Sequence, residues 1–299
     1  MNFLTLADLP ADRWPALFDR AAELKRNRLQ QTLAGKSVAL VFEKASTRTR
    51  VSFEVGVFEL GGHAVVLTSQ GSQIARGEPI EDTARVLSGY CHAIILRTFG
   101  QDRVETLANH ASVPVINALT DEHHPCQVAT DLFTVREKFG ALNVRYAWVG
   151  DANNMANSWI EAAALLGLDL VLACPQGFQP DQMRIADAQA KQRELGRGSV
   201  WVTDDPSIAV RNAHVISTDV WASMGQEQEA DKRKAAFAGY CVDAALLEHA
   251  RSDAVVLHCL PAHRGEEIAA DVLDGPRSLA WVQAENRLHV GKAILEVVM

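Results

Sequence analysis

Apolar runs of strand length alternate with segments of helical spacing along the whole chain. Such runs, with few polar residues inside them, are typical of strands buried on both faces of a parallel sheet. In the first half we predict strands at Ser37–Phe42, His63–Thr68, Ala93–Phe99 and Val113–Leu119. In the second half we predict strands at Arg145–Val149, Asp169–Ala173, Val200–Thr203, Ala213–Thr218 and Ala254–Cys259.

The intervening segments have apolar residues three and four positions apart, which predicts helices. They include Ile80–Tyr90, Ser158–Leu166, Asp181–Leu195 and Ile268–Leu273. The regular alternation of strand and helix indicates an α/β fold in which helices cover both faces of parallel sheets.

The pattern restarts near residue 140, so we expect two doubly wound parallel-sheet lobes joined by two helices. The first helix has Pro125 in its first turn and Gly140 after its end, and the second covers residues 285–298. The predicted domains are residues 1–135 and 136–279. A C-terminal helix at about 280–299 is expected to pack back on the first domain.

Composition and charge narrow the classes of partner. The chain has 299 residues, of which 48% are hydrophobic, and a formal net charge of −8. This balance argues against a nucleic-acid or anionic-membrane surface, so an anionic ligand needs a local cationic cluster. The chain has 5 cysteines and no C-x-x-C, no signal-peptide pattern and no apolar run of bilayer length. We therefore expect a cytoplasmic protein with free thiols.

Polar clusters follow the predicted strands at their carboxyl ends, where ligands bind in open α/β sheets. In chain order they include EKASTRTR, RTFG, NALTDEHHPCQ, GDANNMANS, TDVWASMG and HCLPAHRG. If both lobes present these ends to a shared cleft, the clusters converge on one ligand.

The stretch FEKASTRTRVSFE, residues 42–54, places cations where a helix is predicted to begin. Ser46 or Thr47 is expected to cap the helix, yet the first turn carries Arg48 and Arg50, and no acid follows the cap before Glu54. A cation at a helix N-terminus costs about 0.3–1 kcal/mol. A bound phosphate would reverse this cost, because backbone N–H groups, hydroxyls and a guanidinium would all point at it. The alternative is an exposed turn whose arginines pair with nearby acids.

Nucleotide-binding signatures are missing. The sequence has no G-x-G-x-x-G after a predicted strand and no G-x-x-x-x-G-K-[ST]. We therefore expect the phosphate to belong to a small substrate rather than to NAD or ATP.

Six motifs, in register, resemble the aspartate/ornithine carbamoyltransferase family. They are FEKASTRTRVSFE, GSQIARGEPIEDTARVL, HPCQ, DVWASMG, HCLPAHRG and QAENRLH. The S-T-R-T-R and H-P-x-Q elements belong to the wider family, and SMG and HCLP resemble its ornithine branch. The resemblance covers most of residues 38–296.

The resemblance implies transfer of a carbamoyl group from carbamoyl phosphate to L-ornithine, giving L-citrulline in arginine biosynthesis. It implies a carbamoyl-phosphate lobe, an amino-acid lobe and a homotrimer with active sites at subunit contacts, without metal or cofactor. For carbamoyl phosphate it implies Ser46, Thr47, Arg48, Thr49, Arg97, His124, Gln127, Cys259, Leu260, Arg287 and, from a neighbouring subunit, Gln73. For ornithine it implies Asn154, Asp219, Ser223 and Met224. Arg97, His124 and Cys259 are the expected catalytic residues.

The chemistry of the residues agrees with these roles. Attack of a neutral amine builds negative charge on the carbamoyl oxygen, and Arg97 and His124 can donate to it. No Lys or Arg lies between His214 and Asp231, whereas Asp219 can pair with an ammonium, which favours a diamino acid over aspartate. Because only the neutral amine attacks, the rate is expected to rise with pH.

Other interpretations remain open at this stage. His258, Cys259 and His263 are possible metal ligands, although their spacing matches no zinc pattern. A two-lobed α/β protein can also bind an amino acid without chemistry. Acetylornithine, putrescine or aspartate are alternative acceptors. Asn153 and Asn154 both suit a turn, so either can face the acceptor.

Overall fold

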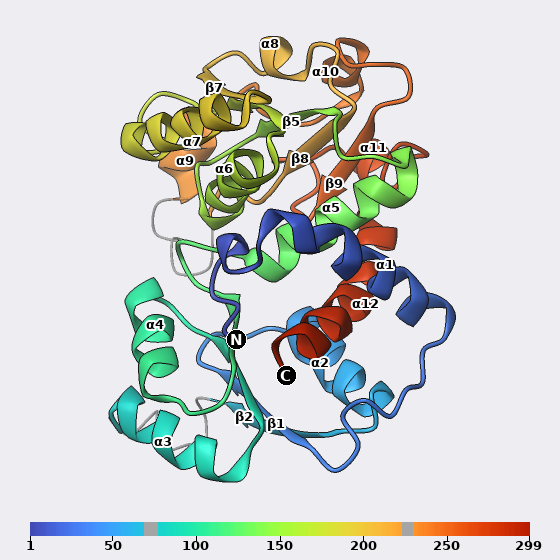
Figure 1. The fold of residues 1–299 in the computed structure, drawn as a ribbon. Helices are drawn as coiled ribbons and strands as arrows, with labels where there is room; N and C mark the ends of the chain where they lie inside the picture. The colour runs from blue at the N-terminus through green and yellow to red at the C-terminus, as the bar shows by residue number, and fades with distance from the viewer. Residues whose placement is uncertain (69–76, 223–229) are drawn as a thin grey trace. The chain divides into compact units, whose positions relative to one another are not determined.

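The computed structural model describes residues 1–68, 77–222 and 230–299 (Figure 1). The chain divides into two compact units. Unit 1 comprises Met1–Phe133 and Glu285–Met299, and unit 2 comprises Thr134–Ala284. Each unit is built on its own parallel sheet.

The sheet of unit 1 has four strands in the order β2-β1-β3-β4. They are β1 (Ser37–Phe42), β2 (His63–Thr68), β3 (Ala93–Arg97) and β4 (Val115–Leu119). The chain moves outward from β1 to β2 and then crosses to β3 on the other side, so the strand order reverses between β1 and β3. Phe42 lies opposite Arg97 at the carboxyl end of this pair. This switch point is where such sheets bind ligands.

Helices cover the sheet of unit 1. They are η1 (Leu6–Asp8), η2 (Ala11–Arg13), α1 (Trp14–Arg26), α2 (Arg48–Glu59), α3 (Ile80–Tyr90), α4 (Gln101–His110) and the first part of α5 (Pro125–Phe139). Most of α12 (Ala280–Val298) also belongs to this unit. Val41 and Leu96 of the sheet pack with Leu87 of α3 and Val104 of α4 in one buried cluster.

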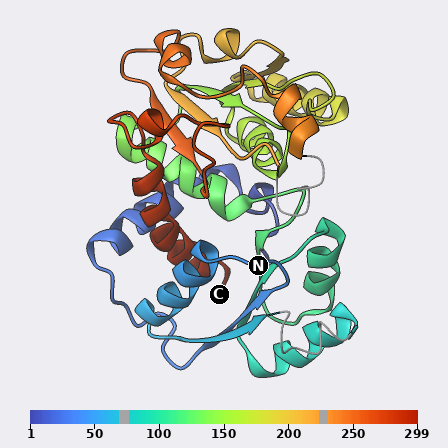
Figure 2. The ribbon, with the colours of Figure 1, turned by 180° about the vertical axis from the view of Figure 1, so that it is seen from behind.

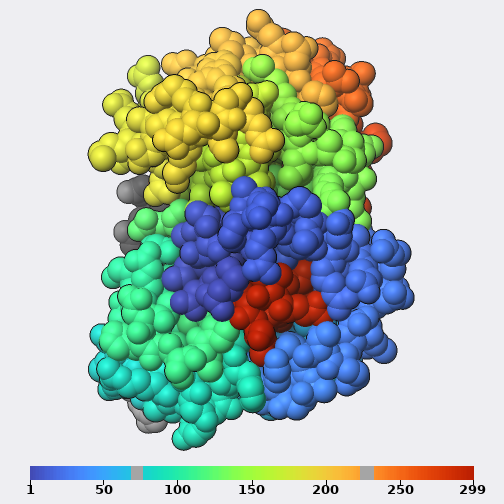
Figure 3. Space-filling model, in the orientation of Figure 1, coloured from blue at the N-terminus to red at the C-terminus, as the bar shows by residue number. Residues whose placement is uncertain are grey.

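A buried ion pair ties α12 to α2 and to the end of α1. Lys292 is fully buried, and its Nζ donates to Glu59 Oε2 at 2.7 Å and to the carbonyls of Leu24 and Arg28. Burial opposes ionisation of Glu59, but hydrogen bonds from Arg28 and Lys292 outweigh it and lower its pKa. On one face of the molecule, the C-terminal residues lie surrounded by N-terminal segments (Figure 3).

The sheet of unit 2 has five parallel strands in the order β7-β6-β5-β8-β9. They are β5 (Arg145–Val149), β6 (Asp169–Ala173), β7 (Ser199–Thr203), β8 (Val215–Thr218) and β9 (Val255–His258). The order reverses between β5 and β8, where Val149 lies opposite Thr218. Thr218 in turn lies opposite His258 of β9. Three strand ends therefore meet beside this switch point.

The helices of unit 2 lie on both faces of its sheet, as the two opposite views show (Figures 1 and 2). They are α6 (Asn154–Leu166), α7 (Gln182–Leu195), α8 (Pro206–Val210), α9 (Ala230–Ala236), α10 (Ala244–Glu248) and α11 (Ala270–Leu273). Tyr146 of β5 packs against Trp159 of α6 with ring centroids 5.3 Å apart. The next residue, Ala147, belongs to a cluster with Val210 and Leu247 of the other helices. Side chains of successive β5 residues thus pack on opposite faces of the sheet, and both faces are buried.

The predicted α/β class with two parallel-sheet lobes is confirmed, and α5 and α12 carry the chain between the units. Each predicted strand is present, with ends that differ by at most two residues. Helix α6 starts four residues before the predicted start, because Asn153 caps it, and α12 starts at Ala280. No helix within the described residues is both long and apolar enough to span a bilayer.

We predict that Glu59→Gln lowers the free energy of unfolding by about 3–5 kcal/mol, because it leaves the Lys292 ammonium buried without its carboxylate. Urea unfolding measures this. Since the pKa of Glu59 is lowered from 4.5, the wild-type pair stabilises the fold above that pH and loses its contribution as pH falls below it. Glu54→Gln, in the exposed Arg50–Glu54 pair, should change stability by less than about 0.5 kcal/mol. Equal effects of the two substitutions would contradict the prediction.

Candidate functional site

Helix α2 begins directly after the loop that follows β1, with no acid in its first turn. Thr47 occupies the N-cap position but makes no side-chain capping bond; instead Ser46 Oγ accepts from the Thr49 N–H at 3.3 Å. Arg48 and Thr47 are exposed. Among the residues that the structure describes, no side-chain hydrogen bond or ion pair involves Arg48, whereas Arg50 pairs with Glu54 at 3.5 Å. The alternative interpretation, an exposed turn whose arginines pair with nearby acids, therefore holds for Arg50 and not for Arg48.

Two further guanidinium groups meet at Thr49, which is only 2% exposed. Arg97, the last residue of β3, donates from Nη1 to Thr49 Oγ1 at 3.4 Å. Arg287 of α12 donates from Nη2 to the same oxygen at 3.0 Å. The neutral hydroxyl accepts from both cations, so the switch point of unit 1 carries concentrated positive charge.

The start of α5 adds two polar groups to this cluster. Gln127 is 1% exposed; its Oε1 accepts from Arg287 Nη1 and its Nε2 donates to Asp131 at 2.8 Å. This fixes the orientation of the amide. His124 is also buried, and burial, reinforced by the charges of Arg287 and Arg97, lowers its pKa well below 6.5. Its imidazole is therefore neutral at pH 7, and its one N–H group can donate a hydrogen bond to an oxygen.

Acids near this cluster are paired with other cations. Glu43, directly after β1, accepts three bonds from Arg103 at 2.6–2.9 Å. Asp121 pairs with the buried Lys44, whose Nζ also lies 4.5 Å from the centroid of the Phe99 ring. Neither carboxylate is left to oppose an anion at α2. Sequence reasoning did not identify these pairs, because residues such as Glu43 and Arg103 are 60 positions apart.

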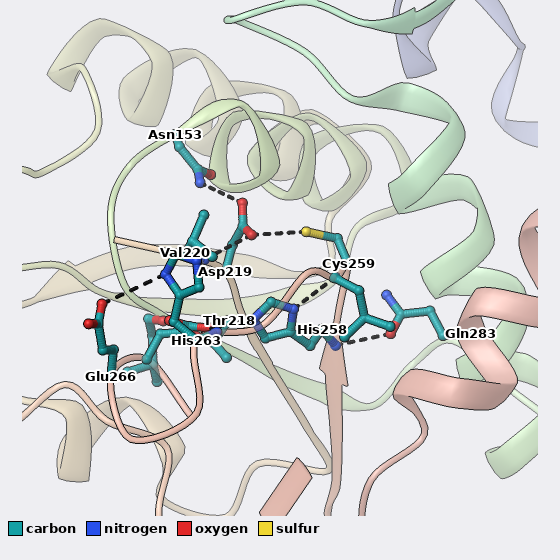
Figure 4. Close-up of polar contacts among 12 residues, drawn as sticks. Asn153, Thr218, Asp219, Val220, His258, Cys259, His263, Glu266 and Gln283 are labelled. Carbon is teal, nitrogen blue, oxygen red and sulfur yellow. Dashed lines mark hydrogen bonds and ion pairs between the residues drawn. The ribbon is translucent and has the colours of Figure 1, made fainter. Parts of the chain in front are cut away.

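In unit 2, Asp219 lies just after β8 and gathers donors from three strand ends (Figure 4). Its Oδ2 accepts from Asn153 Nδ2 at 2.8 Å. Its Oδ1 accepts from the Cys259 thiol at 3.0 Å and from the Val220 N–H at 2.8 Å. Asp219 is 7% exposed. This carboxylate is held in place and is suited to pairing with a cation.

The two asparagines after β5, Asn153 and Asn154, have different structural roles. Asn153 Oδ1 accepts from the backbone N–H groups of Met155 and Ala156 and caps α6. Its Nδ2 is engaged with Asp219, so both ends of its amide have structural partners. Asn154 is the first residue of α6 and is half-buried.

A tight turn follows β9 and carries Cys259 and Leu260. Leu260 has φ 57°, in the left-handed region, and the Leu260–Pro261 bond is cis. His258 Nδ1 accepts from the Leu260 N–H at 2.8 Å, and the His258 N–H donates to Gln283 (Figure 4). His258 Nε2 lies 3.0 Å from Glu267 Oε1.

The metal-site interpretation meets a physical objection here. Donor atoms of Asp219, His258 and Cys259 lie within 4.8 Å of one another. However, both ring nitrogens of His258 are hydrogen bonded, and the Cys259 thiol donates to Asp219. A metal at this point would have to break those bonds.

Arg233 of α9 links the segment after β5 to the segment after β8. It is 7% exposed and donates to Asp151 Oδ2 at 2.7 Å and to the Trp221 carbonyl at 2.8 Å. Its guanidinium lies 5.0 Å from the centroid of the Phe178 ring. Burial, only partly offset by Arg233, raises the pKa of Asp151.

The structure therefore brings Thr49, Arg97, His124, Gln127 and Arg287 together in unit 1. In unit 2 it brings Asp219 and Cys259 together, with Leu260 in the turn after β9 and Asn154 at the start of α6. Three predicted site residues, Gln73, Ser223 and Met224, lie outside the described residues.

Comparisons with known proteins agree over the whole chain. The family model for the aspartate/ornithine carbamoyltransferase carbamoyl-P binding domain matches residues 1–137, and that for the Asp/Orn binding domain matches residues 142–298. Ornithine carbamoyltransferase of Geobacter sulfurreducens is 56% identical over 303 residues, covering 100% of this chain and 99% of the relative.

Two solved structures are similar as well. Ornithine carbamoyltransferase from Pyrococcus furiosus has a TM-score of 0.95 and 48% identity, covering 100% of this chain and 96% of that one. A protein described as anabolic ornithine carbamoyltransferase from Campylobacter jejuni has a TM-score of 0.95 and 36% identity, covering 99% of this chain and 98% of that one.

We predict that Arg48→Gln weakens binding of inorganic phosphate about 10- to 100-fold, as expected for loss of a charge-assisted hydrogen bond of about 1.5–3 kcal/mol. Isothermal titration calorimetry measures this. Arg50→Gln is the matched control, because Arg50 is two residues away and pairs with Glu54; its affinity should stay within about twofold of wild type. If the two variants bind phosphate equally, the anion does not lie at the start of α2.

Proposed function

The chain belongs to the aspartate/ornithine carbamoyltransferase family, and on that basis we propose that it transfers the carbamoyl group of carbamoyl phosphate to the side-chain amine of L-ornithine. The products are L-citrulline and phosphate. The observation that carries the proposal is the meeting of Arg97, Arg287 and the start of α2 around Thr49.

Unit 1 is the proposed site for carbamoyl phosphate. The phosphate accepts hydrogen bonds from the N-terminus of α2, from the hydroxyls of Ser46, Thr47 and Thr49, and from Arg48. Its charge offsets the mutual repulsion of the guanidinium groups, which no neutral ligand does. The carbamoyl end and its bridging oxygen are assigned to Arg97, His124, Gln127 and Arg287.

The reaction proceeds by attack of the neutral amine nitrogen on the carbamoyl carbon. A carbon–nitrogen bond forms and negative charge develops on the carbamoyl oxygen. The carbon–oxygen bond to phosphate then breaks, and the nitrogen passes a proton to the leaving phosphate. Arg97 and neutral His124 stabilise the developing charge; loss of one such donor typically costs about 2.7–4 kcal/mol. Phosphate leaves into the positive field of Arg48 and α2.

Unit 2 is the proposed site for ornithine. Asp219 and Asn154 are assigned to the amino-acid end of the substrate. Ser223 and Met224, which lie outside the described residues, are assigned to it from the family resemblance alone. Asn154 is preferred to Asn153 because the amide of Asn153 already caps α6 and holds Asp219. Cys259 donates to Asp219, and we assign this thiol and Leu260 to the reacting centre, where a polarisable neighbour tolerates the uncharged amine.

The runner-up function is carbamoyl transfer to another amine. Aspartate would bring a second carboxylate, and the sequence has no Lys or Arg from residue 215 to 230 to pair with it. Acetylornithine keeps the side-chain amine but removes the α-ammonium that Asp219 would pair with. Putrescine lacks the carboxylate. The buried carboxylate of Asp219 therefore favours ornithine over aspartate and acetylornithine. We place the reaction in the cytoplasm and in arginine biosynthesis, where L-citrulline is a product.

The purified protein is expected to form citrulline from carbamoyl phosphate and ornithine, measured colorimetrically, and to prefer ornithine over acetylornithine, putrescine and aspartate. Asp219→Asn should raise the KM for ornithine by about 10- to 100-fold, through loss of a charge-assisted bond of about 1.5–3 kcal/mol, and leave the KM for carbamoyl phosphate nearly unchanged.

Asp253→Asn makes the same chemical change in an exposed pair of unit 2 and serves as the control. It should leave both KM values as in the wild type. Absence of citrulline, with a product from another acceptor, would replace ornithine by that acceptor; no product from any of the four would overturn the proposal.

We also propose a homotrimer. Val51 and Phe58 of α2 are 52% and 72% exposed, and the half-buried Val55 lies between them on one stripe of the helix. The opposite face of α2 is buried through Phe53 and Val57. An apolar stripe of this kind on a surface helix is typical of an interface.

A cyclic trimer needs two different surfaces on each subunit. Helix α3 offers a second exposed apolar stripe in the same unit, formed by Val86 and Tyr90, which are 50% and 76% exposed. Two apolar surfaces on one unit are consistent with head-to-tail closure.

Light scattering during gel filtration should give a mass of about three times 32.6 kDa. Phe58→Glu should shift the protein to the monomer mass, because it places a charge in the proposed interface. Met183→Glu alters a residue of unit 2 that is 75% exposed and should leave the trimer intact. A wild-type monomer would exclude the trimer, and a trimeric Phe58→Glu variant would exclude this surface.

A further inference from the structure

A fully buried carboxylate lies beneath the turn that carries Cys259 and Leu260. Glu267 is 0% exposed, and its Oε1 lies 3.0 Å from His258 Nε2 and 2.6 Å from the backbone nitrogen of His263. One oxygen thus binds the chain on both sides of the turn, before Cys259 and after Pro261.

The hydrogen bonds determine which nitrogen of His258 carries the proton. Nδ1 accepts from the Leu260 N–H at 2.8 Å, so in the neutral ring the proton is on Nε2 and is donated to Glu267. A proton on Nδ1 would remove the acceptor for Leu260. Glu267 therefore fixes the form of His258 that can hold the Leu260 backbone.

The Leu260 backbone needs such a support. Its φ of 57° lies in the left-handed region, which a residue with a Cβ disfavours. The bond from its N–H to His258 is the contact that opposes relaxation of this residue. Glu267 is itself anchored, since its carbonyl accepts from the Val242 N–H at 2.9 Å.

Glu267 is costly to the fold, which also indicates a specific role. Its second oxygen, Oε2, is buried and has no hydrogen-bond partner among the residues that the structure describes. A buried carboxylate with half of its acceptors unused destabilises a protein relative to an apolar side chain of similar size.

We propose that Glu267 is a positioning residue for the transfer reaction, acting through His258 to hold Cys259 and Leu260 in their working geometry. It does not contact the substrates. This inference rests on the proposed function, because it assigns Cys259 and Leu260 to the reacting centre. Holding His258 in this way depends on the length of the Glu267 side chain more than on its charge.

The test compares length with charge. Glu267→Asp keeps the charge but withdraws the carboxylate by about 1.5 Å, beyond hydrogen-bond distance of both donors. It should lower kcat roughly 10- to 100-fold while the KM for ornithine, set by Asp219 and Asn154, changes less than threefold. Glu267→Gln keeps the length and one acceptor oxygen, and should retain kcat within about threefold. Glu266→Asp, one residue away in an exposed pair with Lys234, is the matched control and should match wild type.

A second readout does not depend on catalysis. The rate of Cys259 alkylation by iodoacetamide, followed by peptide mass spectrometry, should rise several-fold in Glu267→Asp and stay at the wild-type value in Glu266→Asp. A wild type without citrulline activity would overturn the proposed function, yet the alkylation rates would still test the positioning of the turn.

Three results would overturn the inference: wild-type alkylation of Cys259 in Glu267→Asp, an unchanged kcat in that variant, or an equal loss of kcat in Glu267→Gln. If Glu267→Asp does not fold, His258→Asn takes its place. Its Oδ1 can still accept from Leu260, but its amide is too short to bind Glu267. It should show the same loss of kcat with an unchanged KM, and a wild-type kcat would overturn the inference.

Discussion

Arg97 and Arg287 donate hydrogen bonds to the same hydroxyl of Thr49, and the organisation of unit 1 depends on this shared acceptor. Two guanidinium groups held close to one another repel, and a neutral oxygen does not cancel their charge. Positive charge is therefore concentrated beside Thr49, and an anion would be attracted there. A phosphate at the start of α2, as proposed, would offset this repulsion, and by mass action its binding would stabilise the folded chain.

Both units place their polar residues by the same topological rule and then differ in charge. In each unit the strand order reverses beside the first strand, β1 or β5, and the loops at that point project polar side chains. In unit 1 these loops supply arginines and a helix N-terminus without acids. In unit 2 they supply Asp219 and amides. One fold type thus presents opposite charge at the same topological position, as the proposed anion site and the proposed site for a cationic amino acid require.

The sequence predicted the elements well because each has a local signal. Strands buried on both faces read as continuous apolar runs, and Pro125 and Gly140 mark the ends of α5. The strand-end rule also led to Arg97 and Asp219. What the sequence did not predict depends on long-range contacts. Glu267 is an ordinary loop acid until the fold brings it beneath His258, and Leu260 carries a positive φ without a glycine to signal it. Asn153 and Asn154 have the same side chain, and their roles differ because Asn153 caps α6 whereas Asn154 is its first residue.

The overall charge of −8 would oppose an anionic substrate if the acids near α2 were free. Instead Glu43 is held by Arg103, and Asp121 by Lys44. Glu54 pairs with Arg50 on the exposed side of α2. Each pair neutralises an acid with a cation that is not needed for the ligand, and Arg48 keeps its full charge at the helix start. The positive field at α2 therefore depends as much on how the neighbouring acids are paired as on the arginines that would touch the phosphate.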